Sequence, residues 1–204
     1  MLKSPYTNVT DEEWLELRKQ HLRSGFELDF EDQVERLGKV AIRNQLPIQY
    51  FSFALVECRD MFVAGHYYGC ITLCQSVAEG IAKFLIDKNM AEFVAANVST
   101  KIDGGPYTLA NNLHRARVIS DDSKAAFLRI SGQDRNDFHH LNHEVSTDLK
   151  QLEARALECL VALNVVESEV FAYDINNGAI VPKIRKYWPI SADGQTVSVY
   201  TRSM

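Results

Sequence analysis

The sequence predicts an all-α protein, a helical bundle with a short C-terminal β appendage. Apolar residues recur at helical spacing through most of residues 1–175. Capping residues stand where helices would begin, and Gly or Pro stands where they would end. After Gly178 the pattern changes to alternating and β-branched residues, which are typical of strands. We therefore expect a helical domain over residues 1–175 and a small β-rich appendage over residues 176–204.

Length and composition fit an ordinary globular protein. The 204 residues are 46% apolar and 24% charged, enough to bury a core in one main domain. No apolar run reaches the roughly 20 residues that a membrane span needs, and the polar, acidic N-terminus does not resemble a secretory signal. We expect a cytoplasmic protein that does not associate with membranes.

The net charge and the positions of the cysteines limit the classes of protein to which this chain can belong. The net charge of −5 argues against a protein that coats nucleic acid electrostatically, but it allows an enzyme that contacts a few phosphates. The four cysteines lie in apolar helical patterns and form no C-x-x-C pair. We interpret these cysteines, Cys58, Cys70, Cys74 and Cys159, as reduced core residues.

Three helices are predicted in the first third of the chain, over residues 10–25, 29–47 and 48–65. The first opens with a capping box, in which Thr10 is the N-cap and Glu13 follows three residues later. Gly25 is expected to stop it. Asp29 is expected to cap the second helix, which Pro47 ends.

The fourth predicted helix, residues 66–88, has the clearest pattern in the chain. Its apolar stripe consists of Tyr67, Cys70, Ile71, Cys74, Val77, Ala78, Ile81 and Leu85. The opposite side is polar and includes Glu79 and Lys83. Their i, i+4 spacing suits a solvent-exposed ion pair worth about 0.3 kcal/mol.

The second half of the chain contains three more predicted helices, over residues 109–118, 124–130 and 146–173. Ser120 is the expected N-cap of the middle one and Gly132 its stop. In the appendage, Asp193-Gly194 predicts a hairpin. The segment 184–188 is basic and aromatic, which suits either a strand that covers the bundle edge or a surface that stacks a nucleobase.

A polar motif over residues 130–144 holds the candidate functional groups. On an unbroken helix Arg135, His139 and His143 would share one face, whereas Asn136 and His140 would lie on the next. Arg135 and His140 would then point about 140° apart. They can act together if the helix breaks or begins near the motif, or if two copies meet across a dimer.

Three interpretations of this motif compete. Arg135 could bind a phosphate while a histidine transfers a proton, which suits RNA cleavage without a metal. His139 and His143 could bind a metal at i, i+4 spacing, although no H-E-x-x-H, cysteine pair or third ligand accompanies them. Alternatively the histidines are ordinary surface residues and Arg135 pairs with a neighbouring aspartate. Phosphate-binding loops, dinucleotide fingerprints and nucleophile elbows do not occur in the sequence.

The run Arg135-Asn-Asp-Phe-His-His140 reads R-N-x-x-x-H, and here the sequence resembles the HEPN superfamily of ribonuclease and nucleotide-binding domains. The helix over residues 67–88 is similar to the long helix of that family, which bears a glutamate. The motif lies between this helix and a final long helix, as it does in the family. The resemblance covers roughly residues 50–173.

The resemblance implies a helical bundle that dimerises so that two R-x-x-x-x-H motifs face each other across a cleft. Arg135 would hold and polarise the scissile phosphate, His140 would be the general base or acid, and Asn136 would orient the pair. His139 and Glu79 are accessory candidates. Because His139 and His143 lie close to His140 in sequence, the identity of the working histidine stays open.

The implied function is a metal-independent endoribonuclease that needs no cofactor. RNA would be its substrate and a second copy of the chain its partner. Members of the family often belong to toxin–antitoxin or antiviral defence systems, which implies an antitoxin or regulatory protein as a further partner. The alternative is a non-catalytic HEPN-like module that binds a nucleotide or a protein.

Overall fold

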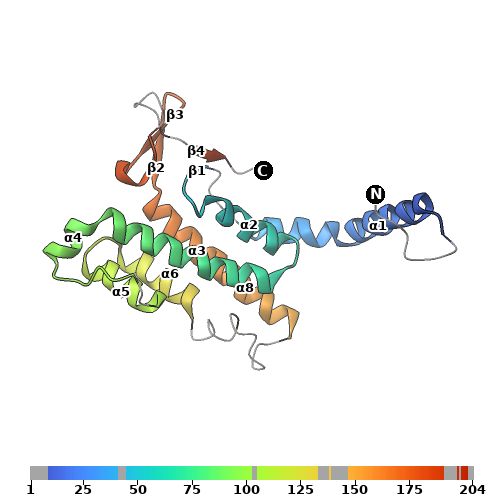
Figure 1. Ribbon diagram of the computed structural model, residues 1–204, viewed down its shortest axis with the longest axis horizontal. Helices are drawn as coiled ribbons and strands as arrows, with labels where there is room; N and C mark the ends of the chain where they lie inside the picture. Colours follow the sequence, from blue (N-terminus) through green and yellow to red (C-terminus); the bar gives the residue numbers. More distant parts are fainter. Residues whose placement is uncertain are drawn as a thin grey trace. The chain divides into compact units, whose positions relative to one another are not determined.

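The structure is a computed structural model that describes residues 9–40, 45–102, 105–132, 138, 147–190, 197 and 199–201. The chain divides into two compact units, Met1–Lys39 and Val40–Met204 (Figure 1). Its described elements are mainly helices, with two small two-stranded sheets. The predicted all-α fold with a β appendage is confirmed at this level. The predicted division at residue 175 stays a prediction.

The first unit contains one long helix, α1 (Asp11–Gly38). Its predicted capping box is confirmed, because the Glu13 backbone N–H donates to Thr10 Oγ1 at 3.2 Å and the Thr10 N–H donates to Glu13 Oε2 at 2.9 Å. These bonds satisfy two donors at the helix terminus. The hydrogen bonds that the Glu13 carboxylate accepts from the Thr10 N–H and the Thr10 hydroxyl lower the pKa of that carboxyl.

The prediction of two separate helices in this region is wrong, because α1 runs without a break through Gly25. A single glycine costs a helix about 1 kcal/mol relative to alanine, which lowers stability without ending the helix. Asp29 is not an N-cap. Its carboxylate instead accepts a hydrogen bond from Arg36 Nη2 at 2.9 Å on the same helix. The helix ends at Gly38, well before Pro47.

The second unit is built around α3, which confirms the best-patterned predicted helix. The helices of this unit are α2 (Ser52–Val63), α3 (Tyr67–Lys88), α4 (Met90–Ala95), α5 (Pro106–Arg115), α6 (Asp121–Ser131) and α8 (Leu149–Val170). Every residue of the predicted apolar stripe is buried. Burial extends to Gln75, Ala82, Phe84 and Ile86, because α2, α4, α5, α6 and α8 all contact α3 (Figure 1).

Helices α3 and α8 run in the same direction. Near their first turns the Tyr67 hydroxyl donates to Glu153 Oε2 at 3.1 Å. Near their last turns the rings of Phe84 and Phe171 have centroids 6.3 Å apart. The two helix beginnings therefore lie at one end of the bundle.

Helix α6 runs opposite to α8. At its start the Ser123 hydroxyl donates to Glu169 Oε2 at 2.6 Å, and Ser120 caps the helix by accepting from the Ser123 N–H at 3.2 Å. Near its end the Ile130 carbonyl accepts from Arg155 Nη2 at 3.3 Å. The last turn of α6 thus lies beside the early turns of α8, and the predicted Ser120 cap is confirmed.

The appendage contains a hairpin that begins earlier than predicted. Strand β2 (Tyr173–Asn176) pairs antiparallel with β3 (Ala179–Pro182). Asn177 and Gly178 connect them with φ of 50° and 80°, and positive φ at both positions is what a type I′ turn requires. The turn therefore lies where the sequence pattern changes from helical to strand-like, and α8 ends at Val170 rather than near Tyr173.

A second small sheet joins distant parts of the chain. Strand β1 (Gln45–Pro47) pairs antiparallel with β4 (Val199–Thr201). The sequence pattern predicts a helix end at Pro47 and does not indicate β1. A three-residue strand carries too little periodicity to be recognised without its partner. The predicted Asp193-Gly194 turn lies outside the described residues.

The basic and aromatic segment 184–188 contains a short 3₁₀ helix, η1 (Arg185–Tyr187), rather than a strand. Tyr187 and Trp188 are both buried. The Tyr187 hydroxyl is hydrogen-bonded to the buried Asn89 side chain, which also donates to the Leu85 carbonyl at 2.6 Å. The segment covers the end of α3, so these two rings are not free to stack a nucleobase.

One helix among the described residues, α3, is long and apolar enough to cross a membrane by length and composition. In this structure 61% of its apolar window is buried inside the protein. A buried core helix meets the same criterion, so α3 is weak evidence for a membrane span.

The four cysteines meet where α2, α3 and α8 pack together. All four are buried thiols that form no disulfide with one another, as predicted. A hydrogen bond to Cys74, followed by burial, raises the pKa of the Cys70 thiol. A hydrogen bond to Cys58 raises the pKa of Cys74 in the same way. The thiols of Cys70 and Cys74 therefore stay neutral.

Replacing Tyr187 with Phe should destabilise the fold by about 1–3 kcal/mol, because the buried Asn89 side chain loses its partner. The free energy of unfolding in urea measures this change. Tyr107→Phe, at an exposed position, is the matched control and should have almost no effect. Equal stability of the two variants would contradict the assigned role of the Tyr187 hydroxyl.

Cys70 and Cys74 of the folded protein should react slowly with iodoacetamide. The thiolate is the reacting form, and the raised pKa of both thiols lowers its fraction at pH 8. Mass spectrometry of protein alkylated at pH 8, folded and in urea, measures the difference. Rapid alkylation of Cys70 or Cys74 in the folded protein would show that the cluster is accessible.

Candidate functional site

Most of the predicted site residues fall outside the part of the chain that the structure describes. This holds for Arg135, Asn136, His139 and His140, and also for His143. Two residues connected with the prediction are described. They are Phe138, at the centre of the motif, and Glu79 on α3.

Phe138 is packed against the first turn of α3. Only 6% of its surface is exposed. Its ring lies 5.4 Å from the ring of Tyr68, measured between centroids and inclined by 50°. The Tyr68 hydroxyl also donates a short hydrogen bond to the Phe138 carbonyl. The centre of the motif is therefore held by one aromatic contact and one hydrogen bond to the same tyrosine.

The chain on each side of the motif is also fixed. On the N-terminal side Gly132 ends α6, where its N–H donates to the Leu128 carbonyl at 3.1 Å. On the C-terminal side Asp148 caps α8, because its carboxylate accepts from the Lys150 N–H at 2.9 Å. Together with Phe138, these contacts attach the motif to the end of the bundle where α3 and α8 begin.

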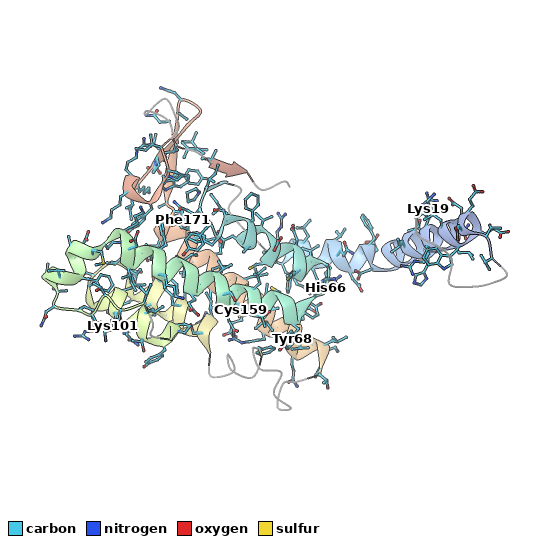
Figure 2. All side chains as sticks on the ribbon, viewed as in Figure 1. Lys19, His66, Tyr68, Lys101, Cys159 and Phe171 are labelled. Atoms are coloured by element: carbon cyan, nitrogen blue, oxygen red, sulfur yellow. The ribbon has the colours of Figure 1, made fainter. Side chains whose placement is uncertain are left out.

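A hollow of about 320 Å³ lies at the same end, and we call it the α3–α8 hollow. It is lined by residues 65–69, at the beginning of α3, and by Leu149 and Leu152 of α8. His66 is exposed, whereas the Tyr67 ring is buried and Tyr68 is half-buried. Figure 2 labels His66 and Tyr68 where α3 begins. Because Tyr68 contributes to both, the hollow and the Phe138 contact are immediate neighbours.

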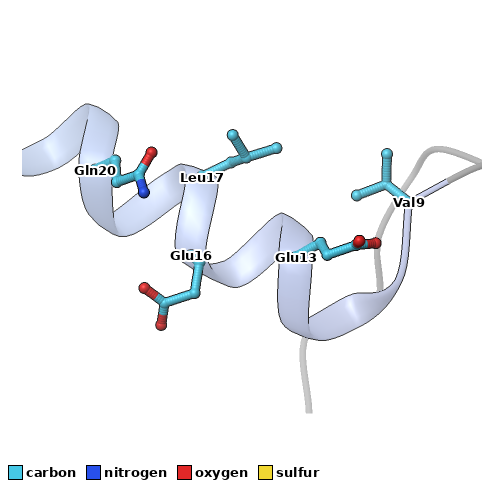
Figure 3. Close-up of a pocket in the computed structure, with 5 residues that line it drawn as sticks. All are labelled: Val9, Glu13, Glu16, Leu17 and Gln20. Carbon is cyan, nitrogen blue, oxygen red and sulfur yellow. The ribbon is translucent and has the colours of Figure 1, made fainter.

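A further hollow, of about 430 Å³, lies along one face of α1 (Figure 3). Its lining side chains come from that helix and the residue before its cap, and they are Val9, Glu13, Glu16, Leu17 and Gln20. Glu13 is engaged in the capping box, and Glu16 binds Lys19 Nζ at 2.6 Å. These acidic side chains already have partners, and the surface is unsuited to a phosphate ligand.

Glu79 forms the predicted ion pair with Lys83, with 2.8 Å between its Oε1 and the lysine Nζ. The two side chains are 24% and 39% exposed, respectively. Glu79 lies eleven residues after Tyr68, which is about 16 Å further along the axis of α3 on nearly the same face. Within one chain it is therefore distant from the contact that holds the motif.

Gln75 lies between Tyr68 and Glu79 on this face of α3. Its side chain is 1% exposed, and neither its Nε2 nor its Oε1 has a hydrogen-bond partner among the residues that the structure describes. An unpaired buried polar group costs about 1–3 kcal/mol and is uncommon in folded proteins.

Comparison with known proteins gives no match to a family model, to a curated protein or to a solved structure. The HEPN resemblance therefore rests on the motif and its helical context. In the described part of the chain, no three His, Cys, Asp or Glu side chains form a group that could hold a metal ion. The metal pair considered above, His139 and His143, lies outside that part.

Sequence reasoning did not identify Tyr68 or His66 as site residues. A signal for the first was present, because Phe138 is a large apolar residue inside an otherwise polar motif and needs a buried partner. The partner could not be named from sequence, since the contact joins residues 70 positions apart. His66 stands directly before α3, where no pattern distinguishes it from an ordinary exposed residue.

Tyr68→Phe should reduce stability by about 1 kcal/mol, because the hydrogen bond to the Phe138 carbonyl is lost while the ring contact remains. Urea denaturation measures the loss, and Tyr107→Phe serves again as the exposed control. Unchanged stability of Tyr68→Phe would show that the hydroxyl does not hold the motif.

Proposed function

We propose that this protein is a metal-independent endoribonuclease of the HEPN type that acts as a homodimer. The observation that carries this proposal is the seating of Phe138 against Tyr68. A buried aromatic at the centre of a polar motif fixes the chain from which the arginine and the histidine project, as a preorganised site requires.

The chemistry assigned to the motif is phosphodiester cleavage by the neighbouring 2′-hydroxyl of RNA. A histidine, His140 in this proposal, removes the 2′-hydroxyl proton, and the oxygen then bonds to phosphorus. The bond from phosphorus to the 5′-oxygen breaks, and an acid protonates the leaving oxygen. Arg135 stabilises the negative charge on the phosphate oxygens through its planar guanidinium, and Asn136 orients the pair.

Chain connectivity supports placing this chemistry beside the α3–α8 hollow. Arg135 is three residues from Phe138 and His140 is two. An extended chain spans at most about 3.6 Å per residue, so chemistry by these two residues would take place within a short distance of Phe138. Arg135 and His140 would point apart if they lay on one unbroken helix. A second copy whose motif faces the first would bring an arginine and a histidine together.

The proposed setting is a cytoplasmic toxin–antitoxin or antiviral defence system with an antitoxin or regulatory partner. His139 remains an accessory candidate. Because Glu79 lies about three turns from Tyr68, its accessory role would be exerted on the motif of the facing copy. To act on that motif, Glu79 would have to leave its ion pair with Lys83.

A non-catalytic HEPN-like module that binds a nucleotide or a protein is the second candidate. The net charge of −5 favours it, because an RNA-cleaving enzyme gains from a positive surface. The two candidates share the fold and the motif. They differ in whether RNA is cleaved.

Purified protein should cleave a mixed-sequence RNA in the presence of a chelator, and His140→Ala should lower the rate by about 10²–10⁴-fold through loss of proton transfer. Arg135→Ala should lower it comparably, because charge on the phosphate is no longer stabilised. Gel electrophoresis of labelled RNA measures the rates.

His139→Ala and His143→Ala, tested beside His140→Ala, identify the working histidine by the largest loss. His21→Ala, on the exposed surface of α1, is the matched control and should cleave at the wild-type rate. Absence of cleavage by folded, dimeric wild-type protein would reject the enzyme in favour of the binding module.

A further inference from the structure

Helix α1, drawn in blue in Figure 1, carries an apolar stripe on its surface. The stripe consists of Leu15, Leu22, Phe30 and Leu37, whose side chains are between 44% and 68% exposed. At about 100° per residue these positions lie within about 80° of the helix circumference and extend over about 33 Å of its length. Val34, also exposed, lies at the edge of the stripe.

Such a stripe normally faces a packing partner, because most of the stability of a helix in a protein comes from burial of its apolar face. The compact unit Met1–Lys39 contains no described helix or strand besides α1. The stripe is therefore not buried within its own unit. A second helix is the natural cover for a narrow stripe of this length.

The stripe is symmetric about residue 26. Leu15 and Leu37 each lie eleven residues from this position, and Leu22 and Phe30 each lie four residues from it. When two antiparallel copies of α1 are aligned at residue 26, Leu15 of each copy meets Leu37 of the other, and Leu22 meets Phe30. A two-fold symmetric contact between identical chains requires a surface that matches itself in this way.

The charged residues of α1 form blocks of alternating sign. Residues 11–16 include four acidic residues and no basic one, and residues 27–35 include five acidic residues and no basic one. Residues 17–25 include three basic residues and no acidic one, and residues 36–39 include two basic residues and no acidic one.

These blocks are complementary in the same antiparallel alignment. Residues 11–16 face the basic end of the partner helix, and residues 17–25 face the partner's residues 27–35. A parallel pair would instead place each block beside a block of the same sign. Opposite charges across a helix pair select its orientation. Ion pairs along α1, such as Glu16 with Lys19, do not prevent this, because exposed pairs of this kind are weak.

We propose that α1 pairs with α1 of a second copy of the chain, in an antiparallel contact centred at residue 26. The apolar stripe and the charge blocks are separate observations, and both give the same orientation and the same midpoint. Helix α1 lies outside residues 50–173, which the HEPN resemblance covers. The contact is therefore distinct from the pairing of two motifs and does not depend on the proposed function.

Cysteine cross-linking of the full chain tests both the orientation and the midpoint. Oxidation with copper–phenanthroline should link a mixture of Leu22→Cys and Phe30→Cys into a dimer several-fold faster than it links either variant alone. In the antiparallel pair residue 22 lies beside residue 30 of the other copy. The two copies of residue 22 are about 12 Å apart along the axis, too far for a disulfide. Wild-type protein, whose four cysteines are buried, gives the background.

A mixture of Leu17→Cys and Glu35→Cys is the matched control. These residues are also exposed and also equally distant from residue 26, by nine positions each, but they lie on the face of α1 opposite the stripe. This mixture should link no faster than the wild type does. Circular dichroism checks the helix content of each variant, and Leu15→Cys with Leu37→Cys replaces the first mixture if either of its variants loses helix.

Sedimentation equilibrium measures the strength of the contact. Leu22→Lys should raise its dissociation constant about tenfold or more, because the symmetric contact loses an apolar side chain from both copies. Leu17→Lys adds the same charge to the opposite face of the helix and should associate as the wild type does.

Faster linking of Leu22→Cys or Phe30→Cys alone than of their mixture would show a parallel pair and overturn the proposal. Equal linking of the control mixture would reduce the result to random collision and overturn it too. No linking of the stripe mixture in helical variants, or equal association of Leu22→Lys and Leu17→Lys, would reject self-pairing and leave the stripe to a helix of another protein.

Discussion

Burial of α3 on several sides positions the helices that surround it. Such a helix requires neighbours that approach closely, and Gly69 permits this on the side of α2. A Cβ on Gly69 would lie 3.0 Å from Met61 Sδ of α2, closer than such atoms normally come. A larger residue there would require the Met61 side chain to move. At Gly80 the carbonyl accepts from the Tyr50 hydroxyl at 2.7 Å, so the chain before α2 is fastened to the middle of α3.

The shared direction of α3 and α8 gives the bundle two different ends. At one end, Phe84, Phe171 and Tyr187 form an aromatic cluster closed by the Asn89 hydrogen bonds. At the other end two helices begin, and the end of α6 lies close to them. The first end contributes packing. The second presents a hollow, a histidine and the attachment of a polar motif, which is the arrangement expected where function is placed on a rigid frame.

Local signals predicted the helices well and tertiary contacts poorly. The Thr10 and Ser120 caps, the Gly132 stop and the stripe of α3 depend on neighbours within a few residues, and all were recognised. Gly25 was misjudged because the cost of glycine in a helix is small compared with the stability of the 28-residue helix around it. Strand β1 and the 3₁₀ form of residues 185–187 depend on partners far along the chain.

The same distinction applies to the candidate site. The motif was found from residue types alone, since arginine and histidine at that spacing indicate a chemistry. Its attachment to Tyr68 was not found, because nothing local relates Phe138 to a residue on another helix. The hollow likewise depends on α3 and α8 beginning together, which follows from packing.

The contact between Tyr68 and Phe138 has a consequence for when the protein becomes active. It joins positions 70 residues apart, so during synthesis it cannot form until all of the intervening chain has been made. A growing chain on the ribosome completes α3 long before Phe138 is added, and during that interval nothing seats the motif. Under the proposed function, the ability to cleave RNA would arise at the end of folding. A partly synthesised chain would then pose no threat to the messenger RNA or to the ribosome that is making it.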